Sequence, residues 1–171
     1  MRSRPPYDKM RPQLSEMDTT AAERPTPVAF PRPVAAVGPR MLKPPRDLAD
    51  GAHPLAQPVE HTPYARKILG PDKLLLPQQT VLFDTPRARS GTGPSGRANC
   101  LRQAKAYVAG PSERSTDNLV RRGSPATIAG GRKELFDPGA DHALISPATT
   151  TLESIVDVLA TLAPAVTEVS R

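Results

Sequence analysis

The chain has 171 residues, carries a formal net charge of +6, and contains 22 prolines, 11 glycines, one cysteine and no tryptophan. A single cysteine excludes an intramolecular disulfide framework, and leucine, isoleucine, valine and phenylalanine together number only 34. Ordering the backbone costs about 1–2 kcal/mol per residue. A chain with so few large apolar side chains to offset that cost is therefore predicted to be mostly irregular, extended and proline-rich, with no conventional globular domain.

The charge is distributed unevenly along the chain. Residues 1–133 carry 22 lysines and arginines against 11 acidic residues, whereas residues 134–171 carry 1 against 6. The basic part is therefore expected to be attracted to an acidic surface, and the acidic tail is not. The alternative is that the basic excess only keeps a proline-rich chain soluble.

Residues 1–63 hold 13 of the 22 prolines. Each proline lacks a backbone N–H and restrains the residue before it, so this segment is expected to be extended, either along a partner or as a solvated spacer. The N-terminus lacks the apolar region of a classical secretory signal, so none is expected, and no apolar run in the chain approaches the ~20 residues of a membrane span. We expect an intracellular protein, soluble or bound to a particle, with no membrane partner.

Residues 64–83 form the densest apolar stretch and the expected anchor of the chain. Gly70-Pro71 and Pro77 divide it into short pieces. A short strand is predicted near residues 80–84, and a second is conceivable at 67–69. Such strands would add to a partner's sheet edge, or they would form the nucleus of a small fold.

Residues 84–148 are predicted to be a basic linker that contains one short helix, near residues 97–108. Basic side chains here are candidates for contact with an acidic surface or with nucleic acid, although such charges are more often simply solvated. They are Arg97, Arg102, Lys105, Arg121, Arg122, Arg132 and Lys133.

Residues 149–171 are predicted to form an acidic C-terminal helix and tail. Thr150 and Glu153 have the spacing of a capping box, and apolar residues at helical spacing follow, so an amphipathic helix is expected near residues 151–162. Pro164 should end or kink it. Its apolar face is expected to bind a partner groove or a copy of itself, unless it packs on the chain's own anchor.

The apolar residues of the anchor and of this helix are the candidate docking points for a partner. They are Ile68, Leu69, Leu74, Leu75, Leu76, Val81, Leu82, Phe83, Leu152, Ile155, Val156, Leu159 and Leu162.

Catalytic motifs are not supported by the sequence. Gly91–Ala98 has the glycine spacing of a phosphate-binding loop, but Arg97 replaces the lysine and Ala98 replaces the magnesium-binding hydroxyl. The three histidines have no metal-ligand spacing to one another or to the cysteine. We therefore expect no enzyme, no cofactor and no metal. Ser124 follows two arginines in a pattern that basophilic kinases prefer, which makes it a candidate phosphorylation site.

These observations predict a non-catalytic structural protein that lies extended on a large assembly with an acidic surface, such as a filament lattice, a capsid or a ribonucleoprotein. Two alternatives stay open. The chain could be a basic accessory protein that binds nucleic acid, or a disordered adaptor that phosphorylation regulates.

Overall fold

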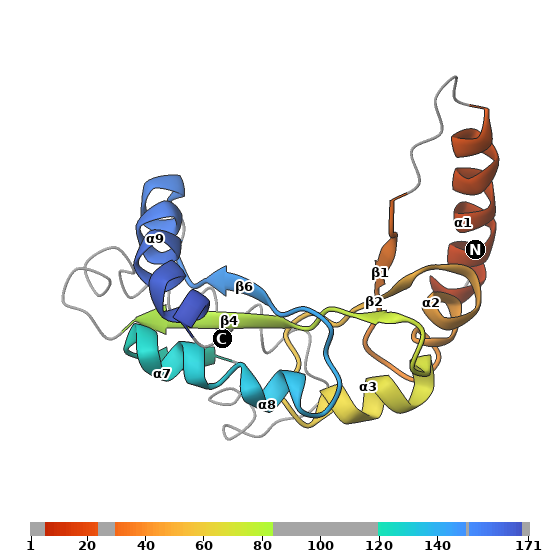
Figure 1. Ribbon diagram of the computed structural model, residues 1–171. Coiled ribbons are helices and arrows are strands. Elements are labelled where there is room, and N and C mark those ends of the chain that lie inside the picture. Colours follow the sequence, from red (N-terminus) through yellow and green to blue (C-terminus); the bar gives the residue numbers. More distant parts are fainter. Residues whose placement is uncertain (1–5, 24–29, 84–119, 150, 169–171) are drawn as a thin grey trace.

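The structure is a computed structural model of the whole chain, and it describes residues 6–23, 30–83, 120–149 and 151–168. Two three-stranded parallel sheets and their connecting helices make an α/β fold (Figure 1). Helix α1 (Pro6–Ala22) stands at one end of the molecule, and helix α9 (Leu152–Glu168) stands at the other.

The first sheet has the strand order β1-β2-β3, with strands Pro33–Ala35, Gly51–His53 and Leu74–Leu75. Helices α2 (Lys43–Leu48) and α3 (His61–Leu69) connect successive strands, as parallel pairing requires. The core beside this first sheet contains small residues as well as leucines. The buried members are Ala36, Leu42, Ala52, Ala65, Leu69 and Leu75.

The second sheet has the order β5-β4-β6, so β4 (Gln78–Phe83) is its central strand. Strands β5 (Val120–Gly123) and β6 (Leu144–Pro147) pair with it on either side. Alternate β4 residues are buried, and Val81 and Phe83 form a core with Ile128 of α7 (Pro125–Gly130) and Leu162 of α9. A short helix, α8 (Lys133–Phe136), follows α7.

Residues 74–83 join the two sheets, because β3 runs directly into β4 across Pro77. Backbone bonds continue through this junction. The Gln78 amide donates to the Pro54 carbonyl at 3.0 Å, and the Leu144 amide donates to the Pro77 carbonyl at 3.0 Å. This single extended segment therefore contributes a strand to each sheet and connects the two, as Figure 1 shows.

The expected irregular, extended chain is wrong. Large apolar residues are few, but the core is also built from alanine, and prolines are buried beside it. Pro44 and Pro45 are buried in the first turn of α2, where a missing N–H costs little. Residues 1–63 contain helices and strands, and residues 67–69 belong to α3 rather than to a strand.

Two local expectations agree with the structure. Strand β4 covers most of the strand expected near residues 80–84, and α9 begins where the C-terminal helix was expected. Helix α9 nevertheless continues past Pro164 to Glu168. The helix expected near residues 97–108 lies outside the described residues.

Candidate functional site

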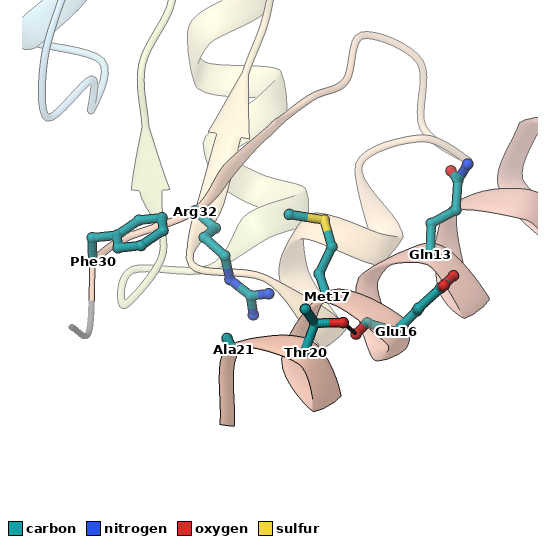
Figure 2. A pocket seen from close by; sticks show the side chains of 7 residues that line it. All are labelled: Gln13, Glu16, Met17, Thr20, Ala21, Phe30 and Arg32. Carbon is teal, nitrogen blue, oxygen red and sulfur yellow. Dashed lines mark hydrogen bonds between the residues drawn. The ribbon is translucent and has the colours of Figure 1, made fainter. Parts of the chain in front are cut away.

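A cavity of about 500 Å³ lies between α1 and the segment that enters β1 (Figure 2). Phe30 and Arg32 form one wall. The other wall is one face of α1, whose residues recur at the spacing of a helical stripe. They are Gln13, Glu16, Met17, Thr20 and Ala21. We call this hollow the α1–β1 cavity.

Arg32 is held in place by two carboxylates. Its guanidinium forms an ion pair with Asp18 of α1 and lies 4.0 Å from the Asp50 carboxylate. The Arg32 backbone amide also donates to Asp50 Oδ2 at 2.7 Å. Arg32 Nη1 is buried and makes no hydrogen bond within the described ranges. Two carboxylates therefore offset the single positive charge in this wall.

The remaining walls combine apolar surface with one carboxylate. The Phe30 side chain is 60% exposed and Met17 is 53% exposed, although both border a concave surface. Glu16 is exposed and forms no ion pair with any residue the structure describes. The Thr20 hydroxyl donates to the Glu16 carbonyl at 3.0 Å, so its oxygen can still accept a bond from an occupant.

Two histidines lie at or just beyond the carboxyl ends of the first-sheet strands, the edge where open α/β sheets usually bind ligands. His53 Nδ1 lies 2.7 Å from the Leu76 carbonyl, and His61 Nε2 lies 2.7 Å from the Val37 carbonyl. Because a carbonyl only accepts, each of these nitrogens carries a proton. The His61 ring also contacts the Tyr64 ring edge-on at 5.6 Å.

Among the residues that the structure describes, these histidines belong to no cluster of metal ligands. No group of three potential metal ligands occurs in the described part of the chain. The expectation of no metal site is not tested by this, since residues 84–119 lie outside the description.

The candidate docking residues fall into three groups by exposure. Leu69, Leu75, Val81, Phe83 and Leu162 are buried in the chain's own cores. Ile68, Leu74, Leu76, Leu82 and Ile155 are half-buried. Leu152, Val156 and Leu159 are exposed on α9. Docking to a partner stays a prediction, and among these candidates the exposed group is the most accessible to solvent.

The candidate basic contacts are partly engaged within the chain. Arg121 pairs with Glu134 at 2.6 Å, and its hydrogen bond lowers the pKa of that carboxyl. Arg132 donates to the Val166 carbonyl at 2.9 Å and lies 6.0 Å from the centre of the Phe136 ring. Arg122 is half-buried and Lys133 is exposed, while Arg97, Arg102 and Lys105 lie outside the described residues. Binding to nucleic acid stays a prediction.

Ser124 caps helix α7. Its hydroxyl oxygen accepts the Thr127 amide at 3.2 Å and lies 2.9 Å from the Thr127 hydroxyl. Its phosphorylation stays a prediction, and the modified side chain would sit at a helix N-terminus.

The α1–β1 cavity is not expected from the sequence, because the prolines of residues 1–63 predict an extended segment there. The missed signal is the stretch from Asp8 to Glu23, which contains only one proline and many good helix formers.

No protein-family model matches the sequence, and no curated protein matches it. One solved structure with a similar fold is an F420-dependent secondary alcohol dehydrogenase in complex with an F420-acetone adduct. The TM-score is 0.53 at 12% sequence identity, and the match covers 81% of this chain and 49% of that chain. The present chain thus spans about half the length of its neighbour, and the likeness shows the fold alone.

The fold overturns the predicted function. A chain that folds into two parallel sheets with connecting helices, an architecture similar to that of a solved structure, is not a disordered protein lying extended on an assembly. The disordered adaptor is excluded for the same reason. The neighbour also gives no support to the expectation that the chain is not an enzyme.

In the described residues, no helix is long and apolar enough to cross a membrane.

Proposed function

We propose that this chain is an α/β protein that binds a small, flat organic molecule carrying a cation or N–H donors in the α1–β1 cavity. The observation that carries the proposal is that two exposed apolar side chains, Phe30 and Met17, line the same hollow of about 500 Å³. That volume is within the range of small-molecule sites.

The apolar walls favour a flat occupant. Exposed apolar surface rimmed by polar residues is characteristic of binding sites, because an occupant removes that surface from water. The Phe30 ring offers an aromatic face, and the Met17 thioether is polarisable and adapts its shape. A planar heteroaromatic ring between them would bury both side chains.

The electrostatics favour a cation or an N–H donor over an anion. Glu16, Asp18 and Asp50 place three carboxylates at or beside the cavity, against the single guanidinium of Arg32. Glu16 is the carboxylate with no ion pair in the described part, so it is the natural acceptor for a ligand N–H. A cation would also gain from the Phe30 face.

The test is a fluorescence titration with proflavine, a planar cationic heteroaromatic, at several salt concentrations. Glu16→Gln should weaken binding mainly at low salt, since it removes a charge. Phe30→Ala should weaken binding about three- to tenfold, as expected for the loss of an aromatic contact. Asp8→Asn, an equal charge change on the same helix outside the cavity, should leave the affinity unchanged. Failure to bind, or equal affinity in all variants, would contradict the proposal.

A second candidate function comes from the fold neighbour. We propose as the alternative that the chain is part of an oxidoreductase that uses F420, with the ligand at the carboxyl edge near His53 and His61. What supports it is the parallel fold shared with an F420-dependent enzyme and the orientation of both imidazoles by backbone carbonyls. Titration with F420 distinguishes the two proposals: His53→Ala should weaken F420 binding under this alternative, whereas Phe30→Ala should not.

A further inference from the structure

Met17 lines the α1–β1 cavity and is also open to solvent. It is 53% exposed, and its side chain extends from α1 towards the segment that holds Arg32 (Figure 2). The thioether of a methionine is oxidised by peroxides to a sulfoxide, and exposure makes that reaction easier. An oxidisable side chain therefore forms part of the wall of the proposed binding site.

The other two methionines in the described ranges are better protected. Met10 is half-buried on the same helix. Met41 is half-buried and packs against the core beside the first sheet. Because a peroxide reaches an exposed sulfur more readily than a packed one, Met17 is expected to be oxidised first, while the core is still intact.

We propose that Met17 is a redox modification site, and that its conversion to the sulfoxide weakens ligand binding in the α1–β1 cavity. The inference rests on the proposed function, since it concerns regulation of the same cavity. In the reaction, hydrogen peroxide transfers one oxygen atom to the sulfur and leaves as water, so the thioether is oxidised by two electrons and the peroxide is reduced. Methionine sulfoxide reductases reverse the change.

The sulfoxide changes the wall against which a flat ligand packs. In the reduced chain, Met17 and Phe30 both offer apolar surface to an occupant. A sulfoxide oxygen is polar and binds water, and the face of an aromatic ring that covers it removes this water without supplying a hydrogen-bond donor. The polarisable thioether contact is lost as well. We therefore expect the oxidised chain to bind proflavine about tenfold more weakly.

The fold should survive the modification. Helix α1 is held by contacts that do not use Met17, since Leu14 is buried and Asp18 forms the ion pair with Arg32. An exposed side chain can become polar without placing a polar group in the core. The loss of affinity would then come from the cavity wall and not from unfolding.

A hydrogen peroxide titration of the full chain, followed by peptide mass spectrometry, measures the order of oxidation. Met17 should become the sulfoxide at a lower peroxide concentration than Met10 or Met41. Dithiothreitol then returns reversibly oxidised Cys100 to the thiol and leaves the sulfoxides in place. Fluorescence titration with proflavine should show the weaker binding, and methionine sulfoxide reductases should restore the affinity. Circular dichroism verifies that the oxidised chain remains folded.

Three variants, each compared before and after peroxide, assign the loss to Met17. Met17→Leu cannot form a sulfoxide, so peroxide should leave its own starting affinity unchanged. Met41→Leu removes a sulfur outside the cavity, so this variant should lose affinity as the parent chain does. Met17→Gln should bind weakly even before peroxide, because its amide also makes the wall polar.

The outcomes separate this inference from the proposed function. A parent chain that does not bind proflavine before peroxide contradicts the proposed function, and this inference with it. A parent chain that binds, and keeps its affinity once Met17 is fully oxidised, overturns this inference alone. Oxidation of Met41 before Met17, or an equal loss of affinity in Met17→Leu, overturns it as well.

Discussion

The Arg66 guanidinium donates a 2.6 Å hydrogen bond to the carboxylate of Asp141, a residue 75 positions further along the chain. It also donates to three backbone carbonyls around the end of α3 and the turn before β6. Asp141 in turn accepts the Leu75 amide at 2.7 Å. This pair therefore ties α3, β3 and the approach to β6 together.

Replacing Arg66 should destabilise the protein strongly. Arg66→Met should lower the free energy of unfolding by about 2–4 kcal/mol, because it leaves several partly buried acceptors without a donor. Arg66→Lys should recover only part of this, since one ammonium cannot reproduce the planar fork. Urea unfolding followed by circular dichroism measures both.

The matched control is the exposed pair of Arg46 and Asp47, whose side chains are about half exposed. Arg46→Met should cost less than about 1 kcal/mol, as is usual for surface pairs. Equal losses in the Arg66 and Arg46 variants would show that the Arg66 network has no special structural role.

Asp141 should make stability depend on acid. Its burial raises the pKa, but the hydrogen bonds from the Leu75 amide and from Arg66 outweigh burial, so its pKa lies below the usual 3.8. The carboxylate therefore stabilises the fold fully above that value, and the contribution is lost as the pH falls through the lowered folded pKa.

Asp141→Asn is the variant that tests this acid dependence. It should be less stable than the parent chain near neutral pH, and the difference should shrink as the pH falls below 3.8. Denaturant unfolding across a pH series provides the measurement. Asp72→Asn, at an exposed position, serves as the control and should change stability little. A stability difference that stays constant into strong acid would argue against the assigned role.

The sequence predicts more of the fold than a count of its large apolar residues suggests. β4 and the start of α9 could be predicted, because β-branched residues and apolar residues at helical spacing are local signals. The expected capping residue, Thr150, lies outside the described residues, and the Ser154 amide donates to the Thr151 hydroxyl instead. The first sheet could not, since its strands are two or three residues long and its core includes Ala36, Ala52 and Ala65. Short strands of small residues have no periodicity to detect.

The α1–β1 cavity was unpredictable for a different reason. Its walls come from a helix and from a separate segment, and their approach depends on the ion pair of Arg32 with Asp18. Nothing local in either segment specifies that contact. The apolar residues of α9 could be named from helical spacing alone. Which of them the core covers depends on how α9 packs on α7 and β4.

Gly51 should tolerate no side chain. A Cβ built on it would lie 2.1 Å from the Leu74 carbonyl oxygen, which is backbone and cannot move aside without separating β2 from β3. Gly51→Ala should therefore cost about 3 kcal/mol or more. Gly38→Ala is the matched control, since nothing lies within 4 Å of its Cβ position, and it should be neutral or slightly stabilising. Thermal unfolding compares the two, and equal midpoints would contradict the close strand pairing.

Ser124 should contribute to stability as the cap of α7. Its hydroxyl accepts the Thr127 amide at 3.2 Å, and the preceding Gly123 has a φ of 139°, so the chain turns sharply into the helix here. Ser124→Ala should lower the free energy of unfolding by about 1 kcal/mol, while Ser124→Asp should retain most of the stability because aspartate also caps helices well. Urea unfolding compares the two variants.

Ser15→Ala makes the same change at an exposed position inside α1, where alanine is the better helix former, so it should be neutral or slightly stabilising. If the alanine variant at position 124 were as stable as the aspartate variant, Ser124 would not stabilise α7, and phosphorylation there would have to act without changing the helix.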